Sequence, residues 1–169
     1  MIQEMVILVD EHDKEIGLME KQEAHIKGLL HRAFSVMVFN GKGEMLLQQR
    51  ALSKYHSGGL WTNTCCSHPR QGETTEEAAH RRLQEEMGFD CELQLHQTFI
   101  YKAPFENGLT EHELDHVFVG IYNQNPHINL DEVNDFHWIS LPDLDQQLRD
   151  EPEKFTVWFK MIMDNYVRL

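Results

Sequence analysis

The segment Thr75–Met87 constrains the fold most strongly, because it combines a helix start, an apolar stripe and a helix stop. Thr74 and Glu77 have the spacing of a capping box at its start, and Gly88 is the residue type that most often ends a helix. The stripe recurs at every fourth position and consists of Ala79, Leu83 and Met87. We therefore predict an amphipathic helix that packs one face against a core.

Strand patterns flank this helix on both sides in the sequence. Ala33–Phe39 leads into Asn40-Gly41, a strong hairpin-turn signal, and Glu44–Arg50 is the returning strand. Further strands are predicted at Met5–Val9, Leu93–Tyr101, Glu111–Tyr122 and Phe136–Ile139, and further helices at Leu141–Leu148 and Glu153–Tyr166. Since strands outnumber helices and no repeat or linker interrupts them, we expect one α+β domain over residues 1–169, a mixed β-sheet sandwiched between helices.

The overall charge and the cysteine content limit the class of protein. A net charge of -13 argues against a nucleic-acid or anionic-membrane partner, yet a few converging Lys and Arg residues can still bind a small anionic substrate. No apolar run is long enough to cross a bilayer, and Glu4 beside the short Met5–Val9 run is not typical of a signal peptide. Three cysteines, two of them adjacent, make a poor disulfide framework, so we expect a cytoplasmic location with free thiols. As a separate expectation, the protein is a monomer or weak dimer.

Two segments around the predicted helix carry reactive or charged side chains. If the segment Trp61–Pro69 is extended, Cys66 and His68 point to one side and Cys65 to the other. A protease-like Cys–His pair is disfavoured, because neighbours on one strand face lie about 6–7 Å apart. On the helix, Arg82 and Glu86 lie four positions apart and share a face. By itself this pattern is typical of a solvated ion pair.

Two further segments carry carboxylates and histidines. In strand alternation Glu111, Glu113 and Asp115 share one face, which fits equally an exposed strand end and a functional site. His25 and His31 flank a short run, and a lone histidine is more often a packing or surface residue than a ligand. Together with His68 and two carboxylates, however, they would fill five positions around a divalent ion.

The helix and its flanks resemble the Nudix box. The matching residues are Glu73, Arg81, Leu83, Glu85, Glu86, Gly88 and Phe89. In that family the helix glutamates hold Mg²⁺ against a diphosphate. This chain departs from the box at Ser67, where a glycine is expected, and at Arg82, where a glutamate is expected. A cation at this position would hold phosphate oxygens rather than a metal, so the box looks altered away from hydrolysis.

The segment Trp61–Pro69 resembles, nearly word for word, the cysteine motif of the type 1 isopentenyl diphosphate isomerases, and the likeness runs from about Met5 to Trp158. Glu111 and Glu113 match the Glu-x-Glu of that family. The resemblance implies five ligands for Mn²⁺ or Mg²⁺, with Zn²⁺ as a competitor, namely His25, His31, His68, Glu111 and Glu113. It also implies that Glu86 binds Mg²⁺ bridging to the substrate.

The same resemblance implies an enzyme that converts isopentenyl diphosphate to dimethylallyl diphosphate by protonation and deprotonation. Cys66 and Glu113 would transfer the protons, assisted by Tyr101, and which of the two protonates stays open. Trp158 would stabilise cationic character, and Trp61 is a second aromatic candidate for the pocket. The residues implied to surround the diphosphate are Lys21, Arg50, Lys54 and Arg82.

Two other classes of protein remain as alternatives. A Nudix hydrolase that cleaves a nucleoside diphosphate derivative explains Glu73, Glu85 and Glu86, but leaves Cys66 and His68 unexplained. A non-catalytic module that binds a divalent metal explains the histidines, but it explains neither the cationic residues nor the tryptophan near the C-terminus.

Overall fold

A mixed β-sheet, centred on strand β3 (His31–Phe39), organises the computed structural model, which describes residues 4–54, 56–105 and 107–166. β3 runs parallel to β8 (Thr110–Ile121) and antiparallel to its other partners. These are β1 (Met5–Val9), β4 (Glu44–Arg50) and β6 (Cys65–Ser67). The outer strands are β2 (Glu15–Glu20), β5 (Trp61–Thr62), β7 (Leu93–Pro104) and β9 (Val133–Ser140).

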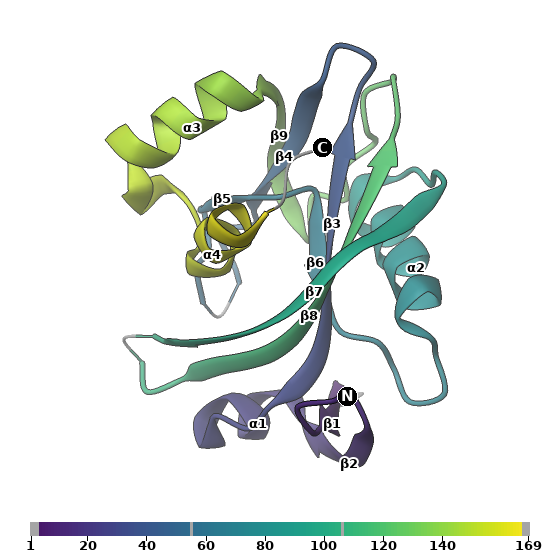
Figure 1. Ribbon diagram of the computed structural model, residues 1–169. Helices are drawn as coiled ribbons and strands as arrows, with labels where there is room; N and C mark the ends of the chain where they lie inside the picture. The colour runs from purple at the N-terminus through teal and green to yellow at the C-terminus, as the bar shows by residue number, and fades with distance from the viewer. Residues whose placement is uncertain (1–3, 55, 106, 167–169) are drawn as a thin grey trace.

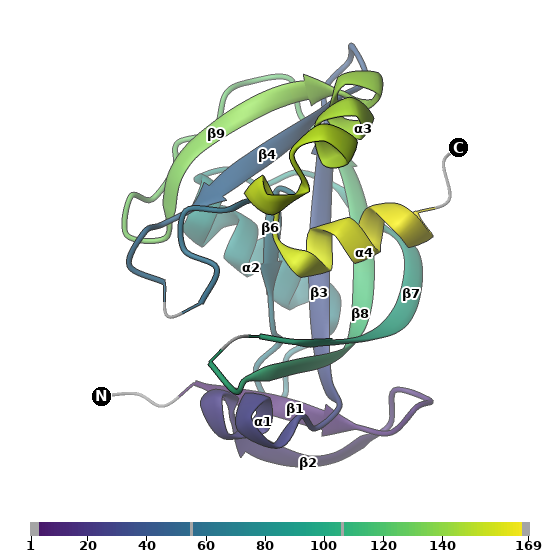
Figure 2. The same cartoon turned by 90° about the vertical axis from the view of Figure 1, so that its left-hand side faces the viewer.

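Helices cover both faces of this sheet (Figure 1). α2 (Thr75–Met87) packs on one face, while α3 (Leu141–Asp150) and α4 (Val157–Asn165) lie over the other (Figure 2). The short helix α1 (Lys21–Lys27) lies beside β1 and β2 at one end of the molecule. The expected α+β sandwich is therefore confirmed, and no helix in the described part of the chain is both long and apolar enough to cross a membrane.

The central strand divides the core into two halves, because alternate side chains of a strand point to opposite faces. Phe34, Val36 and Val38 pack with the apolar stripe of α2. Met37 packs on the other face, with α3 and α4, in a cluster that includes Trp158 and Phe159. Burial of one large apolar side chain contributes about 1.5–3 kcal/mol, so both helix layers are firmly attached to the sheet.

Helix α2 begins and ends where the sequence predicts. The Thr74 hydroxyl accepts a hydrogen bond from the Glu77 N–H at 3.1 Å. Gly88 ends the helix with φ of 71°, and a Cβ at this position would lie 2.1 Å from the carbonyl oxygen of His127. Only glycine fits this close approach, so the sharp exit from the helix is fixed by one residue.

The structure contains two elements that the sequence did not predict, and it differs from two predictions. β2 and α1 had no clear sequence signal, since α1 is short and is capped by the Glu20 carboxylate rather than by Ser, Thr, Asp or Asn. The last helix begins at Val157 instead of Glu153, because the Thr156 hydroxyl caps it. The residues before this cap form a 3₁₀ turn at Pro152–Lys154. β3 and β4 follow one another as predicted, but the main partner of β4 is β9.

Candidate functional site

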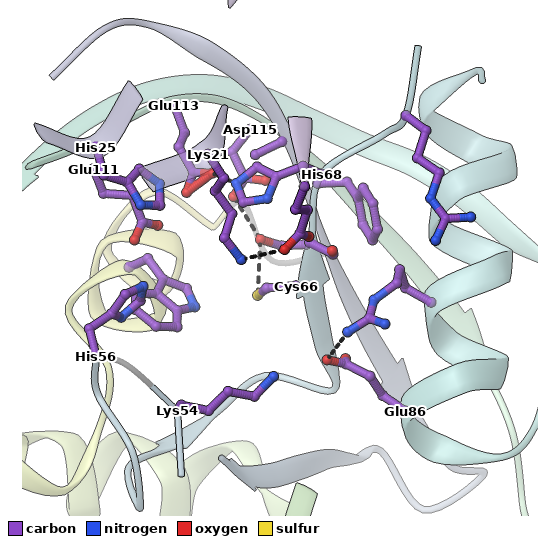
Figure 3. Close-up of a pocket in the computed structure, with 18 of the residues that line it drawn as sticks. Lys21, His25, Lys54, His56, Cys66, His68, Glu86, Glu111, Glu113 and Asp115 are labelled. Carbon is purple, nitrogen blue, oxygen red and sulfur yellow. Dashed lines mark hydrogen bonds and ion pairs between the residues drawn. The ribbon is translucent and has the colours of Figure 1, made fainter. Parts of the chain in front are cut away.

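A cavity of about 890 Å³ lies where β3, β6, β7 and β8 meet α1, α2 and α4. Except for His31 and Trp61, every residue that the sequence analysis assigned to a site lines this cavity. The structure thus brings together side chains that are spread from Lys21 to Trp158. In Figure 3, His25, Glu111 and Glu113 lie at one end of the cavity and Lys54 and Glu86 at the other, with Cys66 between them.

The first end of the cavity, here called the histidine–carboxylate end, is built by strand register. Glu113 on β8 lies opposite Tyr101 on β7 and beside His31 on β3. The Tyr101 hydroxyl is 2.5 Å from Oε1 of both Glu111 and Glu113. Since Glu111 and Glu113 are only 6% and 4% exposed, the alternative of a solvated strand end is wrong.

Burial changes the acidity of these groups, because a low-dielectric environment disfavours a charged carboxylate. It raises the pKa of Glu113 to about 7 and the pKa of Asp115 to about 7. It also raises the pKa of Glu111 and of the Tyr101 phenol. Two carboxyl groups on one face of β8, those of Glu113 and Asp115, therefore gain and lose protons near neutral pH.

Three histidines stand beside these carboxylates. One ring nitrogen from each of His25, His31 and His68 lies within 4.8 Å of the others. Nε2 of His68 is 3.1 Å from Oε2 of Glu113, and Nε2 of His31 is 3.6 Å from the same oxygen. Burial lowers the pKa of His25 and of His68 to about 4, so both imidazoles are neutral at physiological pH.

The orientation of His31 shows that the cluster fits a metal ion. Its Nδ1 lies 2.9 Å from the carbonyl oxygen of Leu29, which can only accept, so Nδ1 carries the proton. Nε2 then presents a lone pair, is buried, and has no hydrogen-bond partner among the described residues. Such a backbone contact on the remote nitrogen is typical of metal-binding histidines. Together the three imidazoles and the neighbouring carboxylates can hold a divalent metal ion.

The opposite end of the cavity, here called the cationic end, pairs basic residues with two carboxylates. Arg82 contacts Glu86 at 2.9 Å and Glu132 at 3.4 Å, and Lys54 also forms an ion pair with Glu132. Glu86 is 5% exposed, so the solvated ion pair expected for this helix face is wrong. Lys21, which also lines the cavity, pairs with Glu4 at 2.7 Å.

Cys66 lies between the two ends. As predicted for an extended segment, Cys66 and His68 line the cavity, whereas Cys65 packs in the core against α2. The Cys66 sulfur is 3.0 Å from Oδ1 of Asn63 and 3.5 Å from Oγ of Ser35. Burial and the nearby Asp115 carboxylate raise the pKa of the Cys66 thiol, which favours its protonated form.

Aromatic rings form one wall of the cavity. The Arg50 guanidinium lies 5.0 Å from the centre of the Trp158 ring. His56 stacks on Phe105 and lies edge-on to Trp158, with ring centres 5.1 Å and 5.7 Å apart. The predicted place of Trp61 in the pocket is not what the structure shows. Pairing with β4 leaves its ring partly buried against the apolar cluster that includes α4, and edge-on to His137 at 6.4 Å.

The cavity residues to which the sequence analysis gave no role include His56, Asp115 and Glu132. The strand alternation that selected Glu111 and Glu113 also includes Asp115, so a signal for it existed. His56 and Glu132 lie in loops without periodicity, and only the folded chain brings them to the cavity.

Comparison with known proteins agrees with this geometry. The family model of the NUDIX domain matches residues 29–159. Isopentenyl-diphosphate Delta-isomerase 2 of Photorhabdus laumondii is 55% identical over 161 residues, covering 95% of this chain and 91% of the relative. Isopentenyl-diphosphate Delta-isomerase of Pectobacterium atrosepticum is 55% identical over 156 residues, covering 92% of this chain and 87% of the relative.

The chain belongs to the isopentenyl-diphosphate Delta-isomerase family, within the NUDIX fold.

A solved structure supports the fold independently. The crystal structure of DR0079 from Deinococcus radiodurans superposes with a TM-score of 0.81 at 19% identity, covering 98% of this chain and 100% of the other. At this identity the likeness shows the fold alone. The NUDIX fold is therefore shared with distant proteins, while the relatives in the isopentenyl-diphosphate Delta-isomerase family match over nearly their whole length.

Proposed function

We propose that the protein isomerises isopentenyl diphosphate to dimethylallyl diphosphate by a 1,3-transfer of protons. The observation that carries this proposal is one cavity in which the Cys66 sulfur lies between a proton-exchanging end and a cationic end. The reaction needs both ends, because one must move protons on an apolar five-carbon unit while the other holds its diphosphate.

The reaction needs one side chain that donates a proton and another that accepts one. A proton is added at the terminal alkene carbon and another is removed two carbons away, so the product has the same composition as the substrate. Cys66 and Glu113 are the proton-transferring pair. Tyr101 shares a short hydrogen bond with Glu113 and can supply or take up its proton. General acid–base groups of this kind work best when their pKa lies near the operating pH, as that of Glu113 does.

His25, His31, His68, Glu111 and Glu113 would hold the metal ion, which is Mn²⁺ or Mg²⁺, with Zn²⁺ as a competitor. When bound, such an ion withdraws charge from Glu113 and makes its protonated form a stronger acid. The free lone pair on Nε2 of His31 supports this ligand set.

The cationic end would bind the diphosphate. Arg82 and Lys54 would contact phosphate oxygens, and Glu86 would hold a Mg²⁺ ion that neutralises them. Lys21 and Arg50 lie on the walls of the same cavity and would complete the site. Binding at this end fixes the five-carbon unit beside Cys66.

Trp158 would stabilise positive charge that develops on the substrate. An indole face attracts a cation by about 2 kcal/mol when water is excluded. Trp158 is 4% exposed and lines the cavity, which fits this role. A cytoplasmic location and a monomeric or weakly dimeric state remain part of the proposal.

Incubation with isopentenyl diphosphate and Mg²⁺ or Mn²⁺ in D₂O, followed by NMR, tests the function. We expect dimethylallyl diphosphate that has incorporated deuterium from the solvent. Release of phosphate without the isomer would instead favour a NUDIX hydrolase. Metal binding without any reaction would favour a binding module.

A further inference from the structure

Asn63 is a fully buried residue whose amide has a fixed orientation. Its Nδ2 donates hydrogen bonds to the carbonyl oxygens of Val36 and Cys65, both at 3.0 Å. Both amide protons are thereby used, and a flipped side chain would place its oxygen against two carbonyl oxygens. Oδ1 must therefore face the opposite way, where the Cys66 sulfur lies at 3.0 Å. An amide oxygen only accepts, so the Cys66 S–H is the donor.

A chain of hydroxyl groups connects this contact to α4. The Thr62 hydroxyl donates to Oδ1 of Asn63 at 2.9 Å, and the Thr156 hydroxyl donates to that of Thr62 at 3.0 Å. Thr156 also caps α4, the helix that carries Trp158. All three of these polar residues are at most 2% exposed. A buried and satisfied network of this kind holds its members in one arrangement.

Ser35 approaches Cys66 from the neighbouring strand. The two residues lie side by side in the antiparallel pair of β3 and β6. The Ser35 hydroxyl donates to Oδ2 of Asp115 at 2.7 Å, so its oxygen is a second acceptor beside the Cys66 thiol, 3.5 Å away. The single S–H proton can point to either acceptor, to Asn63 at the shorter distance or to Ser35. Ser35 is itself 2% exposed and cannot turn away to solvent.

We infer that Asn63 and Ser35 are positioning residues for Cys66, holding its thiol between two fixed acceptors so that the sulfur stays at one place in the cavity. This inference rests on the proposed isomerisation. Neither residue belongs to the proposed metal or diphosphate sites, so their effect is on the reacting geometry. Displacement of a reacting group by about 1 Å can lower a rate by about 10²-fold.

Four variants test the inference. Ser35→Ala deletes a single oxygen atom and Ser35→Thr restores the hydroxyl, while Asn63→Ala removes the stronger acceptor. Cys91→Ser serves as the control, because Cys91 packs against the core cluster and does not line the cavity. In the D₂O assay we expect kcat to fall about tenfold or more for Ser35→Ala and Asn63→Ala, with KM within about twofold of the wild-type value. Ser35→Thr should recover most of the rate, and Cys91→Ser should match the wild type.

The S–H stretching band gives a readout that a purely structural role would not change. The band of Cys66 is identified as the one that Cys66→Ala removes from the infrared or Raman spectrum. Loss of an acceptor in Ser35→Ala or Asn63→Ala should move this band to higher frequency. If Asn63→Ala does not fold, Ser35→Ala alone decides.

The two proposals fail in different ways. A wild-type protein that does not isomerise the substrate would overturn the proposed function, and the positioning role with it. A wild-type protein that isomerises, combined with unchanged kcat and an unchanged S–H band in Ser35→Ala and Asn63→Ala, would overturn the positioning role alone.

Discussion

The two ends of the cavity differ in whether their buried charged groups have partners of opposite charge. At the cationic end, Arg82 and Lys54 each face a carboxylate, so their charges are compensated within the protein. At the histidine–carboxylate end, Glu111 and Glu113 contact a phenol and imidazoles, which are neutral groups at physiological pH. Burial then raises the pKa of both acids.

This difference separates binding from chemistry within one pocket. Paired charges keep their ionisation over a wide pH range and can exchange one anionic partner for another. A buried carboxylate without a cationic partner has a high free energy, which is lowered when it binds a proton or a metal ion. The cationic end is therefore suited to a diphosphate, and the histidine–carboxylate end to proton transfer. Four measurements test this division.

The largest effect is expected at the proton-transferring pair. Cys66→Ala and Glu113→Gln should each lower kcat by about 10²–10⁴-fold, because each removes a group that moves a proton in the transition state. The NMR assay for dimethylallyl diphosphate measures this loss. Cys91→Ala, a cysteine outside the cavity, is the matched control and should keep full activity. If either active-site variant kept the wild-type kcat, that residue would not be a proton-transferring group.

Arg82→Glu should act on binding rather than on chemistry. It replaces a cation of the cationic end by an anion, and we expect KM to rise by about tenfold to a hundredfold. Lys42→Glu, an equal charge change at an exposed hairpin position, should leave KM unchanged. Steady-state kinetics checks this, and an unaltered KM for Arg82→Glu would show that the changed NUDIX box does not serve the substrate.

The pH dependence of metal binding tests the histidine–carboxylate end. Because the pKa of Glu113 is raised to about 7, this carboxyl holds a proton below pH 7 that must leave before it binds a cation. We expect the Mn²⁺ affinity to fall at least about tenfold per pH unit below 7, since Glu111, whose pKa burial also raises, must lose its proton as well. His25 and His68, with pKa values of about 4, do not compete in this range.

Calorimetric titration with Mn²⁺ at several pH values measures this dependence. Glu113→Gln has no carboxyl proton to lose, so it should bind more weakly and with a shallower slope. A wild-type affinity that is flat between pH 5 and pH 8 would contradict the ligand role of Glu113.

The smallest effect has the opposite sign. Glu132 pairs with both Lys54 and Arg82, and it competes with an incoming anion for them. Glu132→Gln should therefore strengthen binding of Mg²⁺ pyrophosphate by about twofold to fivefold, as expected for partly exposed ion pairs. Calorimetry measures this, with Glu153→Gln as an exposed control. Weaker binding by Glu132→Gln would show that this carboxylate helps to hold the anion and its metal.

Features that depend on local periodicity could be read from the sequence. The caps and stripe of α2, the shared face of Glu111 and Glu113, and the opposite orientations of Cys65 and Cys66 all follow from helix or strand repeats. These repeats are properties of the chain itself. The resemblance of whole motifs then supplied the expected roles.

Which of these faces meet depends on the tertiary structure. The parallel pairing of β3 with β8 places His31 beside Glu113, and no local pattern specifies that register. Contacts between distant segments likewise bury Glu86 and bring His56 and Glu132 to the cavity. They also place Trp61 against the core cluster that includes α4. The physical reason is that burial, which sets the pKa values and pairings of the site, is created only when the sheet and helix layers close around it.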